Sequence, residues 1–143
     1  MVSAVLLDLD DTIVDSTAAM LAAGTVAAAH VWPDARPDVH RAAAVRFRAD
    51  PRGLFGEYTR GRLDFAAMRQ ARLADVAAHL GLPDPGDTHT RFEAAYAPAF
   101  AAHLRAFDDV APLLAQAAAR RWPVGVLTNP GAAASKPAPG VKA

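Results

Sequence analysis

The sequence predicts an α/β fold in which a block of helices separates two short parallel strands. Two apolar runs, Val5–Leu7 and Val124–Leu127, are bounded by polar or turn-forming residues, which is typical of buried strands. About ninety residues between them show the apolar spacing of helices rather than of strands. Strands joined through helices pair in parallel, so we expect a small parallel sheet whose two strands are separated in the chain by a helical block.

Composition limits the partners that we expect. The 143 residues include 15 Lys and Arg and 15 Asp and Glu, so the net charge is zero and predicts no nucleic-acid partner. Hydrophobic residues make up 52% of the chain, which is enough for a core, and the absence of Cys excludes a disulfide framework. No signal peptide or membrane-spanning run is evident, so we expect a cytoplasmic protein without membrane contact.

The end of the first predicted strand holds a cluster of carboxylates. The apolar run leads into Asp8, Asp10 and Asp11, at the place where open α/β sheets bind their ligands. Alternate residues of an extended chain point to the same side, so Asp8 and Asp10 can converge. Their mutual repulsion would be relieved by a divalent cation. The alternative is a polar turn in which Asp11 or Asp15 caps the next helix.

The helical block is divided by capping and turn residues. Asp15 or Ser16, Asp38, Asp64 and Asp109 are predicted N-caps, and Gly81 is a predicted helix end. The expected helices are Thr17–His30, Asp38–Ala49, Leu54–Thr59, Phe65–Leu80, Thr88–His103 and Val110–Arg120.

The second predicted strand ends in Thr128 and Asn129. The chain then continues as PGAAASKPAPGVKA, whose Pro, Gly and Ala content predicts an irregular tail over residues 131–143.

Together these residues resemble the haloacid dehalogenase-like (HAD) hydrolases. Asp8-Leu9-Asp10-Asp11-Thr12 resembles the first motif of that family, and the strand ending in Thr128-Asn129 resembles the second. The resemblance implies that Asp8 is the nucleophile, that Asp10 is the general acid and base, and that both bind Mg²⁺. It also implies that Thr128 and Asn129 bind the transferring phosphate. Lys136-Pro137-Ala138-Pro139 resembles the third motif, with Lys136 on the phosphate, unless the match is chance in a Pro- and Ala-rich segment.

The same resemblance implies a domain division. Residues 1–15 and 105–130 would form a partial Rossmann-like core, and residues 16–104 would form the helical cap of the subgroup with its cap between the first two motifs. Arg60 and Arg62 are candidate substrate contacts in this cap, because a guanidinium can bind a phosphate or carboxylate with two hydrogen bonds. The alternative is that both belong to a solvated helix surface.

The family's acidic fourth motif has no counterpart, because no Asp or Glu follows Asp109. We therefore expect a C-terminally truncated member whose two strands leave apolar sheet surface for self-association or for a partner chain.

Two function classes follow. The first is a Mg²⁺-dependent phosphatase that acts on a small phosphorylated metabolite through an aspartyl-phosphate and is impaired by the missing motif. The second is a non-catalytic fragment or a binding partner that completes its fold on another protein.

Overall fold

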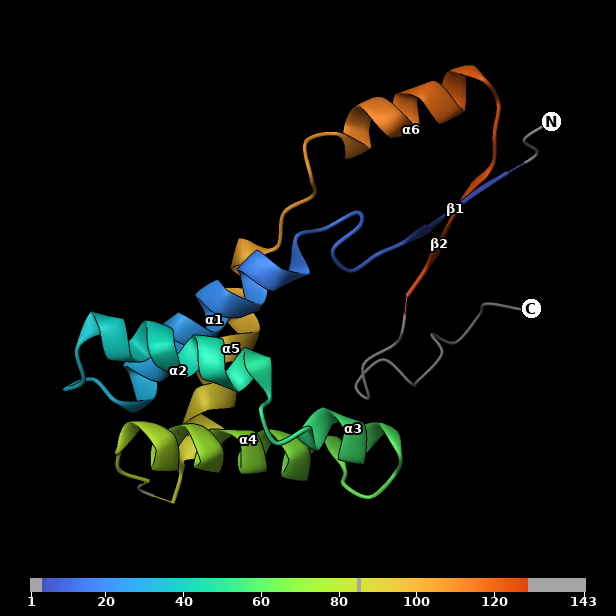
Figure 1. Ribbon diagram of the computed structural model, residues 1–143. Helices are drawn as coiled ribbons and strands as arrows, with labels where there is room; N and C mark the ends of the chain where they lie inside the picture. Colours follow the sequence, from blue (N-terminus) through green and yellow to red (C-terminus); the bar gives the residue numbers. More distant parts are fainter. Residues whose placement is uncertain (1–3, 85, 129–143) are drawn as a thin grey trace. The chain divides into compact units, whose positions relative to one another are not determined.

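The computed structural model describes residues 4–84 and 86–128, and the chain divides into two compact units. Within the described residues, one unit consists of residues 4–14 and 106–128, and the other consists of residues 15–105 (Figure 1). The first unit holds both strands and one helix, and the second holds five helices. The fold is therefore mixed α/β with mostly helical residues, as predicted.

The two strands form a parallel pair. β1 (Val5–Asp8) lies beside β2 (Val124–Leu127) with Val5 opposite Val124 and Asp8 opposite Leu127. The backbone N–H of Val5 also donates to the carbonyl oxygen of Pro123 at 2.8 Å. Because the strands are parallel and in this register, both end at the same edge of the sheet.

The sheet keeps much of its apolar surface exposed. Leu6 is 63% exposed, Val126 is 52% exposed and Leu127 is 60% exposed. Leu6 lies over Gly125, where an added Cβ would come within 3.0 Å of the Leu6 Cδ1 atom. The helix in this unit, α6 (Val110–Ala119), buries Val110 and Ala117.

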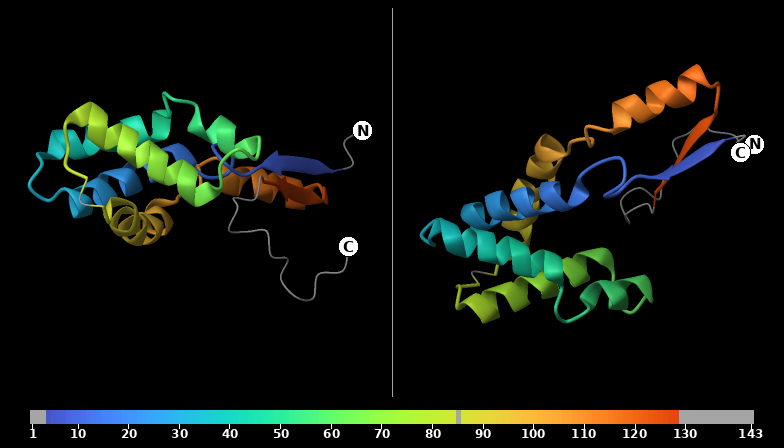
Figure 2. Two further views of the ribbon diagram at one scale, coloured as in Figure 1. Left: turned by 90° about the horizontal axis from the view of Figure 1, so that it is seen from below. Right: turned by 45° about the horizontal axis from the view of Figure 1, so that its top comes forward.

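The helical unit has its own core. α1 (Ser16–Val31) packs against α2 (Pro37–Ala49) and α5 (Thr88–His103), and α4 (Phe65–Leu80) packs against α2, α5 and the short α3 (Leu54–Thr59) (Figure 2). The side chains between these helices are aliphatic and aromatic, and they include Ala27, Val31, Trp32, Ala43, Phe47, Leu73, Val76 and Phe92.

Three of the four predicted caps start their helices as expected, with Asp109 as the N-cap of α6 but without a side-chain hydrogen bond, and one does not. Asp15 Oδ1 accepts a hydrogen bond of 2.8 Å from Ala18 N, and Asp64 Oδ1 accepts one of 2.7 Å from Ala67 N. The prediction that Asp38 caps α2 was wrong, because this helix begins at Pro37 with Arg36 as its N-cap. Proline is suited to the first helical position by its fixed φ, so Asp38 falls inside the first turn and accepts from Arg36 Nε instead.

α1 and α2 approach each other closely at two small residues. A Cβ added to Gly24 would lie 2.9 Å from the Cβ of Ala44 and 3.2 Å from its Cα. Any side chain at position 24 would therefore push the two helices apart.

The helical unit begins and ends at one place. The backbone N–H of Asp15 donates to the carbonyl oxygen of Arg105 at 2.9 Å. Next to this contact in the chain, Val14 forms an antiparallel bridge with Ala106, and Phe107 N donates to Ile13 O at 3.0 Å. The chain thus leaves the strand-bearing unit and returns to it through neighbouring backbone segments.

Among the described residues, none of the helices has the length and hydropathy that a membrane span requires.

Candidate active site

Asp8 and Thr128 lie at the carboxyl ends of neighbouring strands. Asp8 is the last residue of β1, and its register partner Leu127 is the last residue of β2, with Thr128 directly after it. Adjacent strands are about 4.8 Å apart, so a carboxylate and a hydroxyl extend from the same short edge. Both residues are exposed. The predicted pairing of these two strand ends is therefore present in the structure.

Asp10 lies in a tight turn that follows β1. The carbonyl oxygen of Leu9 accepts hydrogen bonds from Ile13 N at 3.0 Å and from Val14 N at 3.1 Å, and Asp11 N donates to Val14 O at 2.8 Å. Asp11 has a left-handed backbone with φ of 55°, which Asp tolerates better than most residues. The strand thus stops at Asp8, and the chain between residues 9 and 14 folds back on itself. The convergence of the Asp8 and Asp10 side chains stays a prediction.

The available oxygen donors suit magnesium in type. Mg²⁺ prefers hard oxygen ligands and is commonly held by one or two carboxylates together with water and substrate phosphate. Asp8 and Asp10 could supply the two carboxylates. Within residues 4–84 and 86–128, no cluster of three or more acidic, His or Cys side chains that could hold a metal is present.

Arg60 and Arg62 lie in the helical unit and share one carboxylate. Arg62 Nη2 donates to Glu57 Oε1 at 2.6 Å, and Arg60 Nη1 lies 3.6 Å from the same oxygen. The hydrogen bond from Arg62 lowers the pKa of Glu57 and raises that of Arg62. The side chains of Arg60 and Arg62 are 61% and 55% exposed, so their remaining N–H groups face solvent. The three residues form a surface cluster with one net positive charge.

Two predicted phosphate contacts, Asn129 and Lys136, lie outside the described residues, as does the predicted irregular tail.

Arg41 was not singled out from the sequence, although the structure places it at a groove of the helical unit. The available signal was its spacing, because Arg41, Ala44 and Val45 fall on one face of a helix. That spacing does not reveal which neighbouring helix this face meets.

The match to a known family agrees with these motifs. A family model of haloacid dehalogenase-like hydrolases matches residues 2–139, and this chain therefore belongs to the HAD-like hydrolases. It is thus a hydrolase in class, and hydrolases of this superfamily generally use Mg²⁺. A comparison with curated proteins finds no match.

Proposed function

We propose that this protein is a Mg²⁺-dependent phosphatase that hydrolyses a small phosphorylated metabolite through an aspartyl-phosphate. The observation that supports this most directly is Asp8 at the carboxyl end of β1, beside the strand end that leads to Thr128. In a chain of the HAD-like hydrolase family, that edge offers a nucleophile and a hydroxyl donor to one incoming group.

The proposed reaction has two steps. A carboxylate oxygen of Asp8 attacks phosphorus, the bond from phosphorus to the leaving oxygen breaks, and Asp10 gives its proton to that oxygen. Asp10 then takes a proton from a water molecule that attacks the phosphorus of the aspartyl-phosphate. The bond to Asp8 breaks, inorganic phosphate leaves, and both carboxyl groups return to their starting states.

The remaining residues would bind and orient the phosphate. The hydroxyl of Thr128 would donate to a phosphate oxygen, with Asn129 and Lys136 as further proposed contacts. Mg²⁺, held by Asp8 and Asp10, would neutralise charge between the anionic phosphate and the anionic nucleophile. Arg60 and Arg62 are proposed to bind an anionic part of the substrate through the N–H groups that Glu57 leaves to solvent.

The test is turnover of an aryl phosphate by the full chain with Mg²⁺. Asp8→Asn keeps the shape of the side chain but removes its nucleophilic charge, so we expect turnover to fall by about a thousandfold or more. Asp108→Asn changes an exposed Asp of the same unit and should leave turnover unchanged. Equal activity of Asp8→Asn and the unchanged chain would contradict the proposal.

The exposed apolar sheet surface supports a second candidate, a non-catalytic chain that completes its fold on a second copy or a partner chain. Leu6, Val126 and Leu127 each leave more than half of their surface to solvent, which is unusual for strands of a parallel sheet. A thermal melt distinguishes the two candidates. Mg²⁺ with beryllium fluoride mimics the aspartyl-phosphate and should raise the Tm of a phosphatase, whereas the second candidate predicts an unchanged Tm.

A further inference from the structure

We propose that the groove between α1 and α2 binds a small aliphatic carboxylate, whose charged group is held by Arg41. The groove belongs to the helical unit, and the proposal does not depend on the activity proposed for Asp8.

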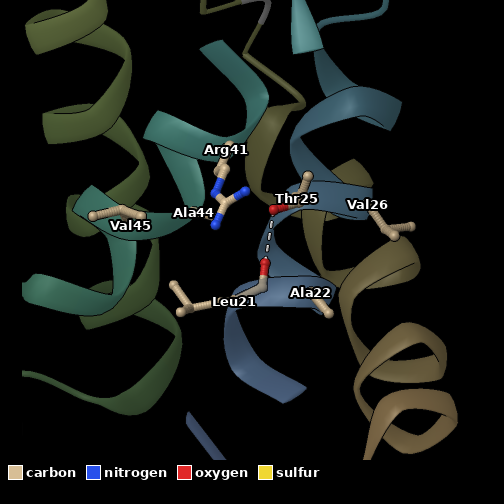
Figure 3. A pocket seen from close by; sticks show the side chains of 7 residues that line it. All are labelled: Leu21, Ala22, Thr25, Val26, Arg41, Ala44 and Val45. Atoms are coloured by element: carbon tan, nitrogen blue, oxygen red, sulfur yellow. Dashed lines mark hydrogen bonds between the residues drawn. The ribbon is translucent and has the colours of Figure 1, made fainter. Parts of the chain in front are cut away.

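The groove is sizeable and mostly apolar. Its volume is about 380 Å³, which falls within the range of about 300–1,000 Å³ that is usual for small-molecule sites. Figure 3 shows α1 and α2 contributing its two walls. The apolar lining consists of Leu21, Ala22, Val26, Ala44 and Val45.

The groove lies at the close contact of two small residues. Gly24 and Ala44 bring the backbones of α1 and α2 together, and Ala44 is also part of the lining. Val26 is 45% exposed and Val45 is 50% exposed, so aliphatic surface on both helices meets solvent. An aliphatic ligand that removed this surface from water would be favoured by the hydrophobic effect.

Arg41 adds an uncompensated positive charge to this apolar surface. Across the described ranges, 4–84 and 86–128, no hydrogen bond or ion pair engages its guanidinium. Two other arginines of the same helix differ, because Arg46 pairs with Asp75 and Arg48 donates to Thr17 Oγ1 at 2.5 Å. The facing helix offers no counter-ion, since α1 contains no acidic residue. The groove is therefore complementary in charge to an anion.

The second polar group of the groove is the Thr25 hydroxyl, which can accept a further hydrogen bond but has no proton left to donate. Thr25 Oγ1 donates its proton to the carbonyl oxygen of Leu21 at 2.8 Å. In Figure 3 the Arg41 guanidinium is turned toward Thr25, across the groove from α2 to α1. A guanidinium can bind both oxygens of a carboxylate in one plane, and the aliphatic walls suit the chain attached to it. The Arg41 charge and the aliphatic walls together favour a carboxylate with an aliphatic body, and Thr25 Oγ1 can accept a hydrogen bond from the Arg41 guanidinium.

Calorimetric titration of the full chain with hexanoate tests this proposal. We expect saturable binding, with acetate and hexanol at least about tenfold weaker, because acetate lacks the aliphatic chain and hexanol lacks the charge. Arg41→Gln should weaken hexanoate binding by about tenfold or more. Arg52→Gln, which changes an exposed arginine in the turn after α2, is the matched control and should leave the affinity unchanged.

A second variant fills the groove instead of removing its charge. Ala22→Leu adds bulk at a partly exposed position of the lining and should abolish hexanoate binding. Circular dichroism shows whether this variant folds, and if it does not, the comparison of Arg41→Gln with Arg52→Gln decides alone.

Three results would overturn the proposal. The first is that hexanoate shows no saturable binding, and the second is that Arg41→Gln binds it as tightly as the unchanged chain. The third is a dimer, detected by sedimentation velocity, that Ala22→Leu dissociates and hexanoate does not. That result would assign the groove to a second copy of the chain.

Discussion

Arg69 donates a hydrogen bond of 2.6 Å from its Nε to Glu93 Oε1, which joins α4 to α5 within the helical unit. The Arg69 guanidinium also lies 4.9 Å from the ring centroid of Phe47 and 4.6 Å from that of Tyr96. Its side chain is only 9% exposed, so its charge is largely removed from water. The ion pair and the aromatic rings replace part of that hydration, while the buried Arg69 Nη2 has no hydrogen-bond partner among the described residues.

Removing Glu93 should therefore weaken the helical unit. Glu93→Ala leaves the buried Arg69 without its carboxylate, and we expect the free energy of unfolding to fall by about 1–3 kcal/mol. Urea unfolding followed by circular dichroism measures this change. Asp38→Ala removes an ion pair with Arg36 that is exposed on both sides, and it should change stability little. Equal effects of the two substitutions would contradict this account of Arg69.

Adding a methyl group at Gly24 should destabilise the chain, although alanine favours helices. A Cβ at this position meets the Cβ and Cα of Ala44, which cannot move without shifting a helix. Overpacking costs about 1–3 kcal/mol, which exceeds the gain of up to about 1 kcal/mol in helix propensity. Gly56→Ala is the matched control, because its Cβ would meet only the mobile end of Arg60. We expect a lower Tm for Gly24→Ala and an unchanged or higher one for Gly56→Ala.

Stability should decrease at alkaline pH through Tyr96. Burial raises the pKa of the Tyr96 hydroxyl above its ordinary value of 10.0, although the neighbouring Arg69 acts in the opposite direction. The unfolded chain then loses this proton at a lower pH than the folded chain does. The contribution of Tyr96 to the free energy of unfolding is complete below pH 10, and it is lost as the pH rises from 10 through the pKa of Tyr96 in the folded chain.

Absorbance titration of Tyr58→Phe measures this pKa alone, because the chain has two tyrosines. Urea unfolding of Tyr96→Phe at pH 9 and at pH 11 should show a smaller loss of stability than in the unchanged chain. A Tyr96 that titrates below 10 would show the expected direction to be wrong.

The proposed acid role of Asp10 predicts a dependence on the leaving group. Asp10→Asn cannot protonate the leaving oxygen, so hydrolysis of an alkyl phosphate should fall by about 10²–10⁴-fold. Formation of the aspartyl-phosphate should be slowed less for p-nitrophenyl phosphate, whose phenolate leaves without a proton, although Asp10→Asn slows the later attack by water for both substrates. The rate of leaving-group release in the first turnover, measured for both substrates in Asp10→Asn and in Asp8→Asn, checks this. Asp8→Asn should lose both activities alike, and the same pattern in Asp10→Asn would exclude the assigned role.

Local signals predicted most of the helix and strand boundaries. α4 follows the cap at Asp64 and stops at Gly81, which adopts the left-handed backbone with φ of 64° that glycine accepts readily. Asp38 misled the prediction because two neighbouring signals competed, and the fixed φ of Pro37 determined where α2 begins. Capping residues, glycine and proline act on the few residues beside them, so their effect on a helix boundary can be predicted from the local sequence.

The candidate site was predictable in its strand ends, and the polar turn with Asp15 as a cap was the alternative that the sequence left open. Asp8 and Thr128 follow apolar runs, and parallel pairing brings such ends to one edge. The turn around Asp10 depends on the left-handed backbone of Asp11. Glycine is the residue that usually indicates this conformation, and an aspartate does not indicate it clearly. Arg41 was missed for a different reason. The groove that it lines exists only where α1 and α2 meet, and no local pattern identifies that contact.

The hydrogen bond between Asp15 and Arg105 has a consequence for how this architecture can change. When the first and last residues of an inserted segment lie next to each other, the chain on either side of the insertion stays close together. A change in the length of residues 15–105 would therefore leave the junctions at residues 14–15 and 105–106 side by side, and it would not by itself separate β1 from β2.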